Sequence, residues 1–261
     1  MKLGAWMVAA VLVAGSLGDA AAEWKPPANP RAQAILGEAR NDAKEKRYED
    51  ALAKHIWIFE HSLEREPAMA GVRLSFALSD WLALGKAYPP AMARLREFRD
   101  GAKQNALAGK ETRKSFMDMA AIDKTLGELA ATAETFKAID EKSEQEAATI
   151  YDLAQPALVR AKAYTLCEKY LEPEKRFEVM RMSRRGGLEA AKKPNLGKSL
   201  LEFTNKKFTN DVTTLVALLV VNKRGDEAQE VARLARKEWD DAAFSKAIDE
   251  ALAGTVPAPW P

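Results

Sequence analysis

Cysteine and histidine are scarce in this 261-residue chain, which contains one cysteine, Cys167, and two histidines, His55 and His61. A single cysteine allows no internal disulfide, and these residues are too few for a Cys/His zinc site. On a helix, two histidines six positions apart lie about 120° out of alignment and cannot chelate one ion as an i, i+4 pair does. We therefore expect no metal site and no cofactor.

An excess of charge of either sign is also lacking. The sequence has 40 Lys and Arg residues against 38 Asp and Glu residues, a formal net charge of +2. This balance argues against a dedicated nucleic-acid-binding protein. The apolar share of 47% and the charged share of 30% are ordinary for a globular protein and exclude a disordered or collagen-like chain.

Long hydrophobic runs are confined to the N-terminus. Met1-Lys2 is positively charged, Leu3 to Leu17 carries no charge, and Gly18 to Ala22 consists mostly of small residues. This three-part pattern is typical of a secretory signal peptide, with cleavage expected after Ala22. The longest later apolar run, Leu215 to Val221, is far shorter than the ~20 residues of a spanning helix. We expect a periplasmic or secreted protein that is not transmembrane after cleavage.

Proline is concentrated at the two ends of the expected mature chain. Residues 23–30 are predicted to be an extended leader and residues 255–261 a proline-rich tail, because proline fixes φ and removes an N–H donor. The segments between are rich in Ala, Leu, Glu, Lys and Arg, which favour helices, and show no strand alternation. The sequence therefore predicts one all-α domain over 31–254. Internal prolines, expected at helix boundaries, stand at positions 67, 89, 90, 156, 173 and 194.

Apolar spacing predicts several individual helices. One has a stripe formed by Leu52, Ile56, Phe59 and Leu63, and a second, at about 70–86, is apolar on two sides, one of which includes Phe76. A third runs from about 113 to 140, with Gly127 as its weak point. Polar residues expected to begin later helices are Ser143 (with Glu146 as a capping box), Asn210 or Asp211, and Asp240 or Asp241.

A repeat is visible in the helix pairs. Tyr48 and Tyr88 are 40 residues apart, and so are Ala51 and Ala91, while a third pair turns at Gly225-Asp226 before Ala228. Each second helix thus has a small residue just after the turn, as close helix contact requires.

This pattern resembles the tetratricopeptide repeat, whose second helix opens with a Tyr-x-x-Ala-like element. In that register Ala39 takes the small position of the first helix, whereas His55 and Ile58 replace an aromatic and a small residue. The resemblance implies stacked antiparallel helix hairpins in an α-solenoid, with irregular middle helices and a concave face for a protein or peptide partner. The stretch 48–95 also resembles a class of exported bacterial proteins of unassigned function.

Aromatic residues of the two best repeats are candidates for partner binding. Trp57, Trp81 and Tyr88 either line a groove that holds a peptide or belong to the core.

A basic block is the second candidate surface. Residues 174–207 carry a net charge of +6 against −4 for the rest of the expected mature chain. The block either contacts an anionic envelope component or is a solvated helix face with a flexible break at Arg184 to Gly187. Its candidate contact residues are Arg181, Arg184, Arg185, Lys192 and Lys193.

Catalytic motifs are not found in the sequence. Cys167 is either buried, in an intermolecular disulfide, or a nucleophile, but no sequence signature supplies a base beside it. We therefore expect a non-enzymatic interaction or scaffold protein of the cell envelope. The alternative is a periplasmic enzyme or accessory protein whose site is assembled from distant residues.

Overall fold

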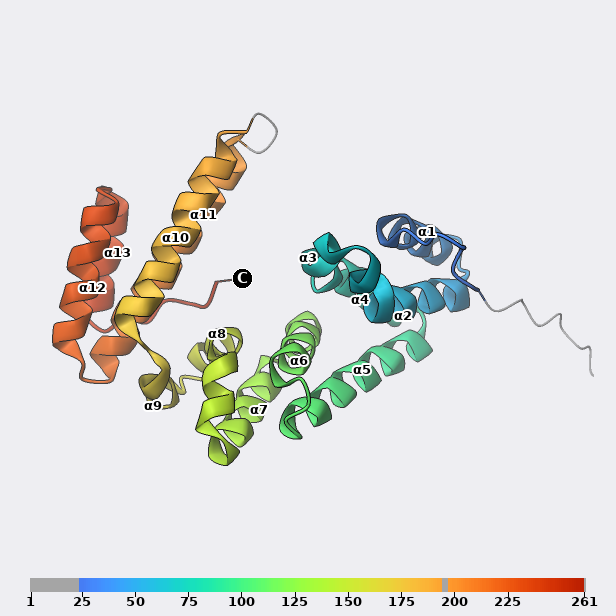
Figure 1. The fold of residues 1–261 in the computed structure, drawn as a ribbon, viewed down its shortest axis with the longest axis horizontal. Coiled ribbons are helices and arrows are strands. Elements are labelled where there is room, and N and C mark those ends of the chain that lie inside the picture. The colour runs from blue at the N-terminus through green and yellow to red at the C-terminus, as the bar shows by residue number, and fades with distance from the viewer. Residues whose placement is uncertain (1–23, 194–196, 261) are drawn as a thin grey trace, which may run out of the picture. The chain divides into compact units, whose positions relative to one another are not determined.

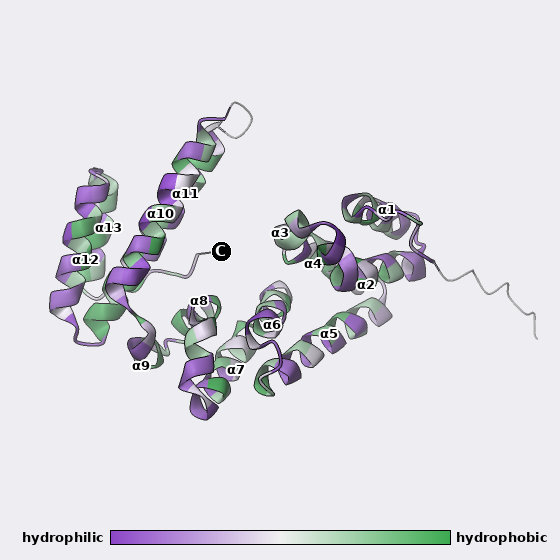
Figure 2. Ribbon diagram, viewed as in Figure 1, coloured by the Kyte–Doolittle hydropathy of each residue, from purple (hydrophilic) through white to green (hydrophobic). Residues whose placement is uncertain are grey.

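The computed structural model describes residues 24–193 and 197–260, so the expected signal peptide and the boundary at Pro194 lie outside the described residues. Within the described part of the chain every regular element is a helix, which confirms the all-α prediction (Figure 1). Hydrophilic and hydrophobic residues alternate along the helices (Figure 2), as expected for helices that pack on one side. Among these helices, none is both long enough and apolar enough to cross a membrane.

The described residues group into two compact units, one up to Met69 and one from Ala70. The first unit is a hairpin of α1 (Ala32–Lys44) and α2 (Tyr48–Arg65), followed by the short 3-10 helix η1 (Pro67–Met69). Ala39 and Ala51 are fully buried where α1 packs against α2, as the small positions of a repeat should be.

The stripe predicted for α2 is rotated from the face that is actually buried. Leu52, Ile56 and Leu63 are half-buried, whereas the buried positions include Ala51, His55, Ile58 and Ser62. This is the register that the repeat resemblance gives. The smaller and more polar face turns to α1 because the two helices approach closely there, and Lys54 and Asp42 form a buried ion pair across the contact.

The helix predicted at about 70–86 is broken in two. It comprises α3 (Ala70–Arg73) and α4 (Phe76–Ala87), and Ser75 between them donates a side-chain hydrogen bond to the carbonyl of Gly71 at 2.6 Å. Such local bonding competes with the helical backbone pattern. Only one of the two apolar sides is buried in α4, and Phe76, which belongs to the other, is 66% exposed. Helix α5 (Pro89–Leu107) begins at the predicted proline boundary.

The long helix predicted at 113–140 is also two helices, α6 (Thr112–Leu126) and α7 (Leu129–Lys142). Gly127 separates them in the left-handed conformation, with φ +77°, which glycine adopts without steric cost. Ser143 caps α8 (Glu144–Arg160) as predicted, by accepting a hydrogen bond from the Glu146 N–H at 3.2 Å.

Pro156 was predicted at a helix boundary but lies inside α8. The ring removes one backbone hydrogen bond. The helix continues because the side chains around the proline, including Tyr151, Ala154 and Leu158, are fully buried.

The last part of the second unit contains four long helices, preceded by a short α9 (Tyr164–Cys167) and η2 (Glu168–Tyr170). Helix α11 packs against α10, α12 and α13, so it is central to this part of the fold. Asp241 caps α13 as predicted, by accepting a hydrogen bond from the Phe244 N–H at 2.8 Å. The long helices are α10 (Pro173–Ala191), α11 (Gly197–Val221), α12 (Gly225–Glu238) and α13 (Ala242–Leu252).

Two predictions for this region are wrong. Helix α10 continues through Gly186-Gly187, where a flexible break was expected, and Asn210 and Asp211 lie in the middle of α11 rather than at its start. Gly187 serves close packing instead, because a Cβ atom there would lie 2.5 Å from the Thr204 hydroxyl of α11. The apolar burial of residues 212–219 keeps α11 continuous past its polar residues.

Candidate functional site

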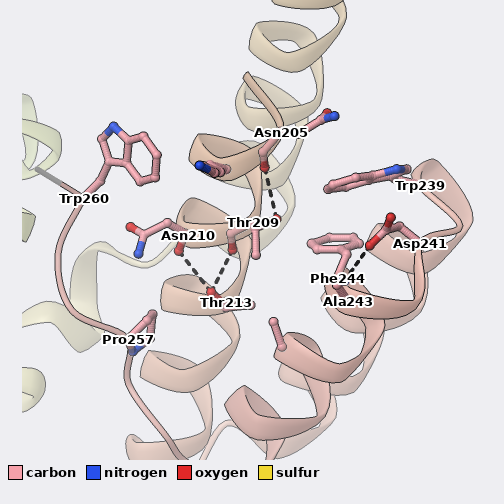
Figure 3. A pocket seen from close by; sticks show the side chains of 12 residues that line it. Asn205, Thr209, Asn210, Thr213, Trp239, Asp241, Ala243, Phe244, Pro257 and Trp260 are labelled. Atoms are coloured by element: carbon pink, nitrogen blue, oxygen red, sulfur yellow. Dashed lines mark hydrogen bonds between the residues drawn. The ribbon is translucent and has the colours of Figure 1, made fainter. Parts of the chain in front are cut away.

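An open, apolar pocket of about 450 Å³ lies in the second unit, between α11, α13 and the proline-rich tail segment 255–260 (Figure 3). Pockets that hold small molecules or single side chains are of this size and character. Its lining residues are Asn205, Lys206, Thr209, Asn210, Thr213, Trp239, Asp241, Ala243, Phe244, Ala247, Pro257 and Trp260.

One wall of the pocket is a rigid aromatic pair. The rings of Trp239 and Phe244 are stacked, with centroids 4.9 Å apart and planes 25° apart. Trp239 occupies the short turn between α12 and α13, and Phe244 is fixed in the first turn of α13, where Asp241 caps its N–H. Phe244 is 1% exposed and Trp239 is half-buried, so packing holds both rings and Trp239 presents the more accessible part of the wall.

A buried arginine supports this wall from behind. The guanidinium carbon of Arg184 on α10 lies 4.6 Å from the ring centroid of Trp239 and 5.2 Å from that of Phe208. Arg184 is 8% exposed, and burial lowers the pKa of its guanidinium. Its Nε donates a 3.3 Å hydrogen bond to the Asn205 side chain. These cation–π contacts hold the charge inside the protein rather than offering it to a partner.

The floor of the pocket is the polar face of α11. Thr209 and Thr213 donate their hydroxyl protons to backbone carbonyls of the preceding turn, at 3.0 Å and 2.7 Å. Their hydroxyl oxygens therefore remain as acceptors, but neither hydroxyl is arranged as a nucleophile.

The opposite wall is formed by the tail. The Asn210 amide on α11 donates a 2.8 Å hydrogen bond to the Ala258 carbonyl, and the Trp260 ring meets Phe203 edge-on at 5.6 Å between centroids. Figure 3 shows Trp260 on the far side of α11 from Trp239 and Phe244. Trp260 and Pro259 also line a second hollow of about 240 Å³, whose other lining residues come from α6, α7 and α8.

The aromatic residues predicted from the repeats lie elsewhere. Trp81 is 1% exposed and its indole N–H donates to the Ala91 carbonyl at 2.9 Å, so it is a core residue that joins α4 to α5. Trp57 is half-buried on α2 beside His61, and Tyr88 is half-buried at the junction of α4 and α5. None of the three lines the pocket described above.

The predicted basic residues are largely engaged within the protein. Arg181 pairs with Glu178 and Lys192 with Glu189, while Arg185 forms two hydrogen bonds, at 3.0 Å and 2.8 Å, with the Glu238 carboxylate. Lys193 is exposed at the end of α10. Glu178 and Glu189 are already counted in the net charge of +6, so among these partners only Glu238, which lies outside the block, offsets part of it.

Cys167 is fully buried, with its Sγ atom 3.6 Å from the Ala163 carbonyl. Burial raises the pKa of the thiol to about 11, which is opposite to the shift that a nucleophilic cysteine needs. Among the described residues, no group of three or more His, Cys, Asp or Glu side chains is arranged to hold a metal ion.

Of the main pocket residues, sequence analysis did not single out Trp239, Phe244 or Trp260, and it noted Asn210 only as an expected helix start. The available signals were the tryptophan directly before the Asp240-Asp241 cap and the tryptophan between two prolines at 259 and 261. No protein-family model, curated protein or solved structure matches this chain.

Proposed function

We propose that this is a non-enzymatic interaction protein that binds a peptide segment of a partner in the pocket between α11, α13 and the tail. The observation that carries the proposal is the open, preformed aromatic pocket of about 450 Å³. Rigid aromatic side chains beside a few hydrogen-bonding groups favour peptide binding, because they contribute contact area with little loss of side-chain entropy.

The polar groups of the pocket support binding rather than catalysis. The Asp241 carboxylate accepts the N-cap hydrogen bond of α13, and the hydroxyls of Thr209 and Thr213 donate to their own helix. A general base or nucleophile would instead have to face a reacting group. The enzyme alternative through Cys167 has less support because that thiol is buried.

The proposal also includes a tetratricopeptide-like arrangement of the helices and a location in the cell envelope. The packed helix pairs α1–α2, α4–α5 and α11–α12 support an array of tetratricopeptide-like hairpins. The pattern over residues 1–22 supports export to the cell envelope. A protein partner is favoured over an anionic envelope component because the pocket is mainly apolar, and Arg184 of the basic block is buried against Trp239 rather than exposed.

Selection from a random-peptide library displayed on phage tests the proposal. Peptides selected on the mature chain should lose binding at least tenfold to Ala243→Trp, because Ala243 is exposed and lines the pocket, so an indole there fills it without disturbing the core. The matched control is Glu134→Trp, which places the same side chain at an exposed position of α7. Selected peptides that bind both variants equally well would contradict the proposal.

A further inference from the structure

The second hollow differs in chemistry from the main pocket. It has a volume of about 240 Å³, and of the described residues only Trp260 lines both. Its walls are mostly apolar and include half-buried side chains from three helices, Met117 of α6, Leu129 of α7 and Leu153 of α8. Pro259 and Trp260 of the tail complete the lining. The hollow is therefore assembled by packing within the second unit, apart from the pocket that the proposed function uses.

Two basic side chains line this hollow without an acidic partner. Lys124 is in the last turn of α6 and Arg160 in the last turn of α8, and both are exposed. Among the described residues, no Asp or Glu lines the hollow, and neither cation forms an ion pair or a side-chain hydrogen bond. Arg113 and Arg185, which are also exposed, each bind a carboxylate. The helix dipole favours a positive charge at each helix end, but it does not explain why two unpaired cations meet at one apolar hollow.

One buried carboxylate lies behind the wall of the hollow. The Thr132 hydroxyl, which belongs to the lining, donates a 2.9 Å hydrogen bond to the carboxylate of Asp123, which is fully buried. Arg99 donates to the same carboxylate at 3.1 Å, so this acid already has its cationic partner. Its charge would repel a doubly charged head group more strongly than a singly charged one.

The volume of the hollow sets the size of a ligand. An apolar cavity of about 150 Å³ accepts benzene, whereas drug-sized molecules occupy pockets of about 300 Å³ or more. The hollow, at about 240 Å³, lies between these limits and suits a molecule of roughly ten non-hydrogen atoms. Its walls match an apolar body, and its two cations match one anionic head group.

We propose that the second hollow binds a small amphiphilic monocarboxylate, with an apolar body of about eight to ten carbon atoms and one carboxylate that Lys124 and Arg160 hold at the surface. This site is independent of the proposed peptide pocket and adds a small-molecule ligand to the protein. The planar donor fork of an arginine fits a carboxylate, and the ammonium adds a second attraction. The apolar body contributes affinity by removing Met117, Leu129 and Leu153 from water.

Isothermal titration calorimetry of the mature chain with straight-chain acids tests the proposal. Octanoate and decanoate are titrated below the concentrations at which they form micelles, and octan-1-ol is the uncharged match for octanoate. Decanoate should bind about tenfold more tightly than octanoate, because two further CH₂ groups are buried. Octanoate should bind at least about fivefold more tightly than octan-1-ol, because only the acid carries the charge that Lys124 and Arg160 attract.

Substitutions locate the site. Lys124→Glu and Arg160→Glu change exposed side chains, so the fold should survive, and each should weaken decanoate binding at least about fivefold. Lys246→Glu is the matched control and should leave the affinity unchanged, because Lys246 is exposed on α13 and lines neither hollow. Ala121→Trp fills the second hollow from a half-buried position and should abolish binding. Ala243→Trp, which fills the main pocket, should not affect it.

Four outcomes would overturn the proposal. Two of them are decanoate that shows no saturable binding and octan-1-ol that binds as tightly as octanoate. The third is equal affinity of Lys124→Glu, Arg160→Glu and Lys246→Glu for decanoate. The fourth is binding that Ala243→Trp removes and Ala121→Trp preserves, because the acid would then occupy the main pocket. The phage selection has its own readout in the main pocket, so the proposed function can stand or fail separately.

Discussion

At the scale of single residues, burial decides the chemistry of the side chains most capable of reaction. His55 is 2% exposed on α2, and burial, together with the positive charge of Arg40, lowers the pKa of its imidazole to about 4. Cys167 is buried with its pKa raised to about 11. Both groups are neutral at pH 7, so each contributes to packing rather than to catalysis.

The shift at His55 predicts a pH dependence of stability. The unfolded histidine has a pKa near 6.5, so the folded state is fully favoured above about pH 6.5 and loses stability as the pH falls toward 4, by up to about 3 kcal/mol. Denaturant unfolding of the wild type and of His55→Leu at pH 7.0 and 4.5 measures this. The difference in the free energy of unfolding between the wild type and His55→Leu should change by roughly that amount between pH 7.0 and 4.5.

The control for this comparison is His61→Leu, because His61 is on the same helix with its side chain 46% exposed. The stability of His61→Leu should depend on pH in the same way as that of the wild type. A His55→Leu variant with the same pH dependence as the wild type would show that His55 is not buried in its neutral form.

Cys167 should react slowly with a thiol reagent. With 5,5′-dithiobis(2-nitrobenzoate) at pH 8, labelling of the folded protein should be at least about 100-fold slower than labelling in denaturant, because the thiol is both inaccessible and protonated. Labelling of the folded protein at the rate of a free peptide thiol would contradict the burial of Cys167 and revive the enzyme alternative.

At the scale of helices, local signals predicted the ends that side chains control and missed those that packing controls. Ser143 and Asp241 cap their helices, and Pro89 and Pro173 begin theirs, because each acts through its own backbone neighbourhood. Pro156 disfavours a helix interior, yet α8 continues through it because the surrounding side chains are buried. Such burial depends on distant helices and was not readable from residues nearby in the sequence.

The two adjacent glycines of α10 differ in the same way, because packing against another helix constrains Gly187 but not Gly186. This difference allows a matched experiment. A Cβ at Gly187 would lie 2.5 Å from the Thr204 hydroxyl, whereas a Cβ at Gly186 would have nothing within 4 Å. Gly187→Ala should destabilise the protein by about 1–3 kcal/mol through forced displacement of α11. Gly186→Ala should be neutral or stabilise by up to about 1 kcal/mol through helix propensity.

Thermal or urea unfolding measures both glycine variants. Addition of Thr204→Ser to Gly187→Ala removes the methyl group that would lie 2.7 Å from the new Cβ and should restore part of the lost stability. Equal effects of the two single alanine substitutions would mean that α10 and α11 do not approach each other as closely as the structure has them.

At the scale of the whole molecule, the candidate site combines residues that are distant in the sequence. Asn205 and Trp260 are 55 positions apart, and the pocket forms because α11 packs against α13 and Asn210 holds the tail. The spacing of small residues in the sequence predicted close helix contacts at Ala51, Ala91 and Ala228, and all three are fully buried. The spacing did not predict the pocket, because no periodic pattern specifies that the turn at Trp239 and the tail 255–260 both meet α11.

The charge of the chain shows a similar dependence on tertiary structure. The basic block has a net charge of +6 in the sequence, yet Arg185 pairs with Glu238, which is 53 positions away, and Arg184 is enclosed by aromatic rings. The local excess of positive charge in the sequence therefore does not by itself show which of these side chains face a partner. The aromatic wall that Arg184 supports is a stronger candidate.

The central claim is that this aromatic pocket binds a partner, and site-specific photocrosslinking tests it most directly. Benzoylphenylalanine replaces the exposed pocket residue Ala243 or the exposed control residue Glu134 in the full chain, which is then irradiated in its native cells. The account predicts a discrete adduct from position 243 that is lost when Trp239→Ala is added, and no such adduct from position 134. Adducts of equal yield from both positions, or an adduct from position 243 that Trp239→Ala leaves unchanged, would contradict it.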